Sequence, residues 1–311
     1  MNTRNLRFRS NRVGDILSLF HEELDVQYGR GEVSAFCEML FGAFLGWDRV
    51  RLLLGREATI DQSDLLRFHW ALEDLHRCRP IQHIIGYADF CGCRIRVNPD
   101  VLIPRPETAE MVQWLTTHLP LSTVQCPLLD LCTGSGCIAI ALKKAFPDAE
   151  VMAVDVSEAA LKVARNNAEL NGVGIHFFQA DILNHPLSAV HYQLIVSNPP
   201  YVMEREREQM QRNVLEYDPA LALFVPDDDP LLFYRAIAAI AQRHLAKEGL
   251  LAVEINEKLA AETCALFADY GFRSTVHTDF RGKPRWVEAR RLEVLSQVGV
   301  HDDGDRTVVE E

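Results

Sequence analysis

Apolar residues in the first part of the chain recur at steps of three and four, which is the spacing of one face of an α-helix. Two such runs begin at Val13 and at Val33, and they predict two amphipathic helices. A third run follows Asp61, a residue type that often begins a helix, and it ends before Pro80. We therefore predict a small helical domain within residues 1–79.

The pattern then changes to short extended pieces separated by Gly86 and Gly92. The predicted strands cover residues 81–85, 87–90 and 94–97. This arrangement over residues 80–106 is typical of a β-hairpin linker.

After the linker, short apolar runs alternate with segments of helical periodicity. Predicted strands cover residues 128–132, 151–154, 175–179, 193–197 and 250–255, and predicted helices cover residues 137–146, 158–171, 230–245 and 259–270. Two extended segments around Gly282 can add an antiparallel hairpin. The alternation predicts the α/β fold class, a doubly wound and mostly parallel sheet over residues 107–290. A flexible acidic tail is expected over residues 291–311.

Composition and charge narrow the class of protein. With 311 residues the chain exceeds a typical domain of roughly 100–200 residues, so two domains are expected. No apolar run reaches the roughly 18 residues of a membrane span, and we predict a soluble protein with no membrane partner. The formal net charge of −12 repels phosphate backbones, which favours a protein substrate over direct DNA binding.

The eight cysteines do not have the spacing of a zinc site. Cys91 and Cys93 are two residues apart, without a matching pair elsewhere. If both lie on a strand, their side chains share one face, so packing is expected rather than metal binding. In a chain without a recognisable secretion signal, they are typical of reduced thiols in the cytoplasm.

Residues 130–136 read Asp-Leu-Cys-Thr-Gly-Ser-Gly between a predicted strand and a predicted helix, where doubly wound folds bind nucleotides. Gly134 and Gly136 can adopt positive φ, and the helix N-terminus that follows offers N–H groups to a carboxylate. Cys137 and Ile138 come next instead of Lys and Ser or Thr, which excludes a phosphate-binding P-loop. A tight turn alone would also explain two glycines. The candidate binding residues of this loop are Cys132, Thr133, Gly134, Ser135 and Gly136.

Two acidic residues follow later strands of the predicted sheet. Asp155 ends the second strand, where a carboxylate can accept hydrogen bonds from a ribose diol, and Asp181 follows the third strand. Each carboxylate alone could also cap a helix. Together with the glycine loop they predict a nucleoside site, in which Asp181 and Ile182 border the adenine.

The fourth predicted strand runs into Asn198, Pro199, Pro200 and Tyr201. This segment resembles the motif of amino-methyltransferases, which methylate planar nitrogens of adenine, cytosine or glutamine. An amide nitrogen is a poor nucleophile because its lone pair is delocalised. The Asn198 oxygen and the Pro199 carbonyl could accept its two N–H groups, and Tyr201 could offer a flat face to the amide. Positioning rather than a strong base is therefore the expected source of catalysis.

The linker makes the resemblance narrower. Residues 80–86, Phe90 and residues 103–108 resemble the stretch between the two domains of the release factor glutamine methyltransferases, and the likeness spans roughly residues 15–290. The resemblance implies a class I methyltransferase fold and a helical domain that docks the substrate. It also implies S-adenosylmethionine as methyl donor, S-adenosylhomocysteine as product, and the N5 amide of the Gly-Gly-Gln glutamine of peptide chain release factors as acceptor. By resemblance the cofactor would contact residues 132–136, Asp155, Asp181, Ile182 and Asn198, and the glutamine would contact residues 198–201.

Three other functions stay open. A related enzyme methylates a glutamine of a large-subunit ribosomal protein, but residues 105–108 and 279–285 look more like the release-factor branch. A DNA adenine methyltransferase would share the motif at residues 198–201, but no basic recognition region is evident. A binding module without catalysis would not need the intact acceptor motif.

Overall fold

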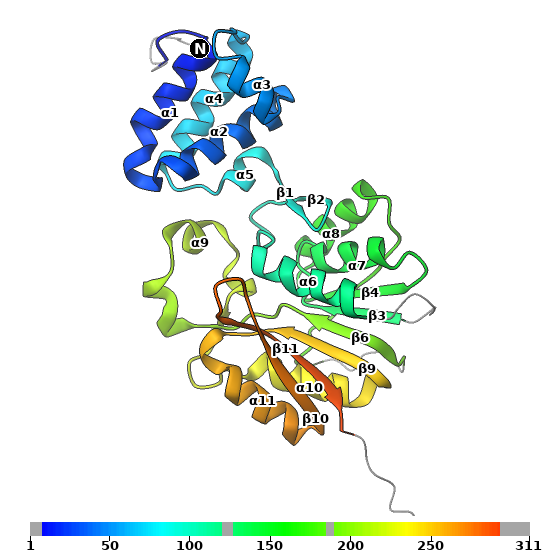
Figure 1. Ribbon diagram of the computed structural model, residues 1–311. Coiled ribbons are helices and arrows are strands. Elements are labelled where there is room, and N and C mark those ends of the chain that lie inside the picture. The colour runs from blue at the N-terminus through cyan, green and yellow to red at the C-terminus, as the bar shows by residue number, and fades with distance from the viewer. Residues whose placement is uncertain (1–7, 120–126, 185–189, 293–311) are drawn as a thin grey trace, which may run out of the picture.

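The computed structural model describes residues 8–119, 127–184 and 190–292. Its N-terminal part is a helical unit with its own core (Figure 1). Phe20, Phe41 and Phe68 are fully buried there, and the ring centroids of Phe41 and Phe68 lie 4.4 Å apart. The helices are α1 Val13–Tyr28, α2 Arg30–Leu45, α3 Arg49–Leu54 and α4 Gln62–His76. The three predicted helices correspond to α1, α2 and α4, and the short α3 is an addition.

The expected extended piece at residues 81–85 is wrong, because this segment is a short helix, α5 Ile81–Ile85. Pro80 precedes it with extended backbone, and Gly86 ends it in the left-handed region with its N–H on the Gln82 carbonyl. These two caps set a single helical turn despite the β-branched isoleucines, whose intrinsic preference is for strands.

The predicted hairpin follows α5. Strands β1 Tyr87–Phe90 and β2 Cys93–Arg96 pair antiparallel. Cys91 and Gly92 form the turn between them, with φ of 47° and 74°. Cys91 and Cys93 therefore do not share a strand, since Cys91 is in the turn and only Cys93 is in β2.

A seven-stranded sheet forms the second part of the molecule (Figure 1). The strands are β3 Pro127–Leu131, β4 Glu150–Asp155, β5 His176–Gln179, β6 Tyr192–Ser197, β9 Leu245–Glu254, β10 Phe272–Thr278 and β11 Pro284–Arg291. Their order is β10-β11-β9-β6-β3-β4-β5, and β11 pairs antiparallel with both of its neighbours while the other pairs are parallel. The predicted α/β class is confirmed.

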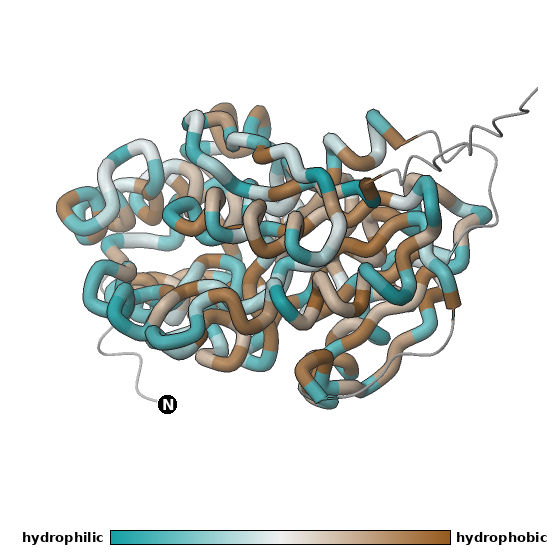
Figure 2. Tube along the Cα trace, turned by 90° about the horizontal axis from the view of Figure 1, so that it is seen from below, coloured by the Kyte–Doolittle hydropathy of each residue, from teal (hydrophilic) through white to brown (hydrophobic). Residues whose placement is uncertain are grey.

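Helices cover both faces of this sheet. One face packs against α6 Pro106–His118, α7 Cys137–Ala145 and α8 Glu158–Leu170, and the other packs against α10 Leu232–His244 and α11 Ala260–Asp269. Neighbouring residues of one strand point to opposite faces, so Leu128 belongs to the first core and Leu129 to the second. In Figure 2, hydrophobic (brown) and hydrophilic (teal) segments alternate along the helices.

Helix α6 is absent from the predicted elements, although its sequence carried the signal. Thr108, Met111, Val112 and Leu115 are buried at helical spacing, and Pro106 occupies the first turn, where proline is tolerated. Between β6 and α10 the chain also forms β7 Val202–Met203, α9 Arg212–Tyr217 and β8 Phe224–Val225, which are too short to be recognised by periodicity.

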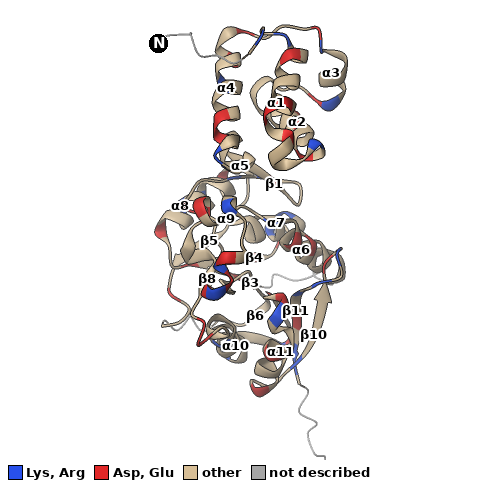
Figure 3. Cartoon of the chain, turned by 90° about the vertical axis from the view of Figure 1, so that its left-hand side faces the viewer, with Lys and Arg blue, Asp and Glu red and all other residues tan. Residues whose placement is uncertain are grey.

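Strand β9 begins five residues before the predicted start, where Leu245 pairs with Tyr192 of β6. Among the described residues, no helix is both long and apolar enough to cross a membrane. The predicted tail lies outside the described residues, apart from its first two positions. Figure 3 shows acidic and basic residues interspersed over both the helical unit and the sheet domain.

Candidate active site

The glycine loop connects β3 to α7 at the carboxyl edge of the sheet. Cys132, Gly134 and Gly136 all have positive φ, at 59°, 52° and 80°. A positive φ is uncommon for a residue with a Cβ atom, so Cys132 holds a backbone conformation that glycine adopts readily. Burial raises the pKa of the Cys132 thiol, which therefore stays protonated at neutral pH.

Gly136 has a packing reason as well as a backbone reason. A Cβ atom at this position would lie 3.1 Å from the Cβ of Ala164 in α8, whereas a Cβ at Gly134 would meet nothing within 4 Å. Gly134 therefore serves the turn and Gly136 serves the close approach of α7 to α8.

A buried carboxylate ties the loop to the helix that follows. Oδ2 of Asp130 accepts hydrogen bonds from the Thr133 hydroxyl at 2.6 Å and from the Ala139 N–H at 3.2 Å. Burial raises the pKa of Asp130 to about 7. The sequence reading passed over this residue, although it opens the loop motif.

Asp155 ends β4 directly beside the loop. One of its oxygens accepts the Gly134 N–H at 2.8 Å and the other accepts the Ser157 N–H at 2.9 Å. Burial raises the pKa of Asp155, and these backbone hydrogen bonds act in the opposite direction. Each carboxylate oxygen has a second lone pair, which leaves acceptor capacity for a ligand hydroxyl.

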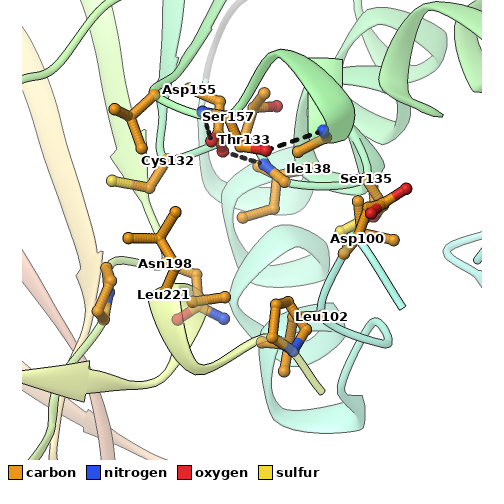
Figure 4. A pocket seen from close by; sticks show the side chains of 18 of the residues that line it. Asp100, Leu102, Cys132, Thr133, Ser135, Ile138, Asp155, Ser157, Asn198 and Leu221 are labelled. Atoms are coloured by element: carbon orange, nitrogen blue, oxygen red, sulfur yellow. Dashed lines mark hydrogen bonds between the residues drawn. The ribbon is translucent and has the colours of Figure 1, made fainter. Parts of the chain in front are cut away.

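The candidate residues surround a cavity of about 380 Å³. In Figure 4, Cys132 and Asp155 lie on one side of it and Leu102 on the other. Its wall also includes Asp181 and Ile182, which follow β5. Asp181 accepts the Leu183 N–H at 2.9 Å and the Asn184 amide at 2.6 Å, so it also caps its own turn. Among the candidate residues, the cavity wall comprises Cys132, Thr133, Gly134, Ser135, Asp155, Asp181, Ile182, Asn198 and Pro200, without Gly136, Pro199 and Tyr201.

The linker supplies the opposite wall of the same cavity, through residues 99–105. Asn167 of α8 connects the linker to the loop, since its Nδ2 donates to the Ser135 carbonyl at 2.9 Å and the Arg96 carbonyl at 3.0 Å. Arg105 forms an ion pair with the buried Asp218. Sequence patterns gave no role to these residues, because their partners lie far away along the chain.

Asn198 lies at the junction of two cavities. It lines the cavity beside the glycine loop and also a smaller one of about 220 Å³, whose wall includes Tyr201. Ser197 pairs with Leu131 in the parallel ladder, so Asn198 and the glycine loop emerge at the same edge of the sheet. The two cavities therefore adjoin at Asn198, and they share Leu102, Arg105 and Ala222 as well.

Two buried residues hold the side chains of the Asn-Pro-Pro-Tyr segment. Asn198 Nδ2 donates to the Thr108 Oγ1 at 3.1 Å, and the Thr108 hydroxyl donates to Glu254 at 2.6 Å. The Tyr201 hydroxyl donates to the other oxygen of Glu254 at 2.9 Å. Sequence reasoning missed both Thr108 and Glu254 as site residues. The available signal for Glu254 was its place at the end of a predicted sheet strand.

No group of histidine, cysteine, aspartate or glutamate side chains that could hold a metal ion is found among the described residues. The loop, the carboxylates and the paired cavities fit a nucleoside-bearing ligand on one side and a small planar group on the other. The N-terminal start of α7 and the remaining acceptor capacity of Asp155 can supply polar contacts to such a ligand.

Comparisons with known proteins agree with this geometry. Residues 19–86 match the PrmC N-terminal domain family, and residues 110–218 match the methyltransferase small domain family. A release factor glutamine methyltransferase of Flavobacterium psychrophilum is 41% identical over 284 residues, which are 90% of this chain and 97% of the relative. A namesake from Bacteroides thetaiotaomicron is 40% identical over 89% of this chain and 99% of its own.

Among solved structures, the release factor-specific protein-(glutamine-N5) methyltransferase of Alicyclobacillus acidocaldarius is 30% identical, with a TM-score of 0.39. The similar region covers 63% of this chain and 99% of that chain. The two curated relatives are matched over nearly their whole length, including both the helical unit and the sheet domain. The chain therefore belongs to the release factor glutamine methyltransferase family.

Proposed function

We propose that this protein transfers a methyl group from S-adenosylmethionine to the N5 side-chain amide of the glutamine in the Gly-Gly-Gln motif of peptide chain release factors. The observation that carries the proposal is the position of Asn198 at the junction of the two cavities. Family membership supports the chemistry and the acceptor. A cytoplasmic location and the absence of direct DNA binding, both expected from the sequence, belong to the same proposal.

The larger cavity is the proposed site of the methyl donor, whose sulfonium supplies an activated methyl group when bound. Residues 132–136 and the start of α7 would receive the amino acid part, with N–H groups available for its carboxylate. Asp155 would accept hydrogen bonds from the ribose hydroxyls through its remaining lone pairs. Asp181 and Ile182 would border the adenine.

The smaller cavity is the proposed site of the glutamine side chain. One N–H of Asn198 Nδ2 donates to Thr108, which orients the carboxamide, and its Oδ1 is the atom that can accept a substrate N–H. The Pro199 carbonyl would accept the second N–H, and the Pro200 ring stiffens the backbone that presents it. Both acceptors would stabilise the positive charge that grows on the nitrogen during transfer. Tyr201, which lines this cavity, would border the amide plane.

The experiment that tests this proposal incubates the protein with labelled S-adenosylmethionine and either a purified release factor or the large-subunit ribosomal proteins. Mass spectrometry then locates the methyl group. We expect label on the Gly-Gly-Gln glutamine, and label only on a ribosomal glutamine would overturn the substrate assignment. Asn198→Ala should lower the single-turnover rate by roughly 10²- to 10³-fold, the loss typical of one preorganised charge-stabilising group. A wild-type rate in that variant would contradict the amide clamp.

A further inference from the structure

A buried carboxylate lies behind the Asn-Pro-Pro-Tyr segment. Glu254 ends β9 next to β6, because Val253 pairs with Ser197 in the parallel ladder. Its side chain is 2% exposed, and each of its oxygens accepts a hydrogen bond from a hydroxyl group, one from Thr108 and one from Tyr201. A carboxylate in this position accepts from both sides and donates to neither.

This arrangement fixes which group donates in each hydrogen bond between Asn198, Thr108 and Glu254. The Thr108 hydroxyl has one O–H group, which donates a hydrogen bond to Glu254 at 2.6 Å. Its oxygen can therefore only accept from Asn198, so the NH₂ end of that carboxamide must face Thr108. The oxygen end of Asn198 is consequently turned away from Thr108 and left for another donor.

We propose that Glu254 and Thr108 are positioning residues for methyl transfer, which hold the Asn198 carboxamide in the one orientation that presents its oxygen to the substrate amide. This inference rests on the acceptor role proposed for Asn198. Thr108 also lines the larger cavity and Glu254 the smaller one, but the positioning role is exerted through the orientation and polarity of Asn198. Hydrogen-bonded chains also polarise one another, so the carboxylate strengthens the Asn198 oxygen as an acceptor.

A hydroxyl donor faces each oxygen of Glu254, in a buried site that raises the pKa of this carboxyl overall. Burial raises the pKa of Glu254 and the nearby Glu107 adds to that effect, while the two hydroxyl donors and Arg285 lower it. Burial and the charge of Glu254 raise the pKa of Tyr201, so its phenol keeps its proton and donates. Glu254→Gln would leave one acceptor and one donor, so the side chain could accept from only one of the two hydroxyls.

The test is a double-mutant cycle on single-turnover methylation of a Gly-Gly-Gln substrate at saturating S-adenosylmethionine. Thr108→Val removes the hydroxyl at nearly constant shape and should lower the rate about 10- to 100-fold, the equivalent of roughly 1–3 kcal/mol for a broken buried hydrogen-bond chain. Thr108→Ser keeps the hydroxyl and should stay close to wild type. Calorimetric affinity for S-adenosylmethionine is measured in both variants, because Thr108 also lines the larger cavity, and a rate loss that parallels a loss of affinity would overturn the positioning role.

The second arm repeats Thr108→Val in the Asn198→Ala background. If Thr108 acts through Asn198, the second substitution should then cost little, whereas an equal loss in both backgrounds would overturn the proposal. Glu254→Gln takes the place of Thr108→Val in the cycle should the latter fail to fold. Thr263→Val is a matched control. Thr263, in α11, is an equally buried threonine that lines neither cavity, and its hydroxyl donates to the Leu259 carbonyl just before the helix.

The result also separates this inference from the proposed function. A wild-type rate in Asn198→Ala would remove the amide clamp itself. A large loss in Asn198→Ala together with a wild-type rate in Thr108→Val would leave the clamp intact and remove only the positioning role.

Discussion

At the scale of single residues, the candidate site depends on carboxylates whose lone pairs are partly used by the protein itself. Asp155 accepts two backbone N–H groups, and Asp130 accepts a hydroxyl and a backbone N–H. Asp155 borders the larger cavity, whereas Asp130 is 1% exposed and lies beneath the loop. The two acids therefore have different expected roles, one toward a ligand and one toward the fold.

Asp155→Ala should weaken S-adenosylmethionine binding by about 1.5–3 kcal/mol, the usual cost of losing a charged hydrogen-bond partner. Isothermal titration calorimetry measures this directly. Asp155→Asn is the matched control, since it keeps a neutral acceptor beside Gly134 and should lose less affinity. An unchanged affinity in Asp155→Ala would sink the ribose assignment.

Asp130 should make the protein less stable as the pH rises. Its pKa of about 7 in the folded protein lies above the ordinary value of 3.8, so the folded state binds the proton more tightly than the unfolded state does. The stabilisation is complete below the unfolded pKa and is lost as the pH rises through about 7. Relative to Asp130→Asn, the free energy of unfolding of the wild type should fall by up to about 4 kcal/mol between pH 4 and pH 8. Urea unfolding at several pH values checks this, and a constant difference would contradict it.

At the scale of elements, the site is a junction of the β3–α7 turn with helix α8. The turn requires positive φ at Gly134 and Gly136, but only the second faces a neighbouring helix. Asn167 in the same helix ties the turn to the hairpin strand β2. Helix α8 therefore packs against the glycine loop through Ala164 and holds the linker through Asn167.

Gly136→Ala should destabilise the protein more than Gly134→Ala. Both substitutions force a Cβ into the left-handed region, at about 1–2 kcal/mol each. Only the first also brings a Cβ to 3.1 Å from the Cβ of Ala164, and overpacking of this kind adds about 1–3 kcal/mol. Chemical denaturation of the two variants measures the difference. Equal losses would show that α8 moves away without cost.

At the scale of the whole molecule, three separate hydrophobic cores favour partly independent units. One core draws only on the helical part of the chain up to residue 85, and the other two cover the two faces of the sheet. A hydrogen bond from the Tyr217 hydroxyl of α9 to the Arg77 carbonyl at 3.0 Å links the units beyond the linker. Both cavities are lined by residues from position 99 onward.

Deleting residues 1–79 should therefore spare S-adenosylmethionine binding, because every residue that lines the larger cavity remains. Methylation of an intact release factor should be lost if the helical unit docks that protein, as proposed. Binding by calorimetry and methylation by mass spectrometry separate the two effects. A short Gly-Gly-Gln peptide is the control substrate, since it has no surface for the helical unit to bind. Full activity of the shortened protein on intact release factor would remove the docking role.

The sequence by itself determined the features that depend on local order. Periodicity of three and four located α1, α2 and α4, and strand–helix alternation located the parallel strands of the sheet, because burial on one face leaves a direct trace in neighbouring residues. The glycine loop and the segment from Asn198 to Tyr201 are contiguous motifs, so they were legible without any tertiary information.

Only the tertiary structure decided how distant residues meet. The turn at α5 depends on its two caps, which outweighed the strand preference of its isoleucines. Thr108 and Glu254 are 146 positions apart, and their contact exists because α6 covers the edge where β9 ends beside β6. No local pattern encodes such a pair, since the donors that offset the cost of burying the carboxylate meet it only once the sheet has formed.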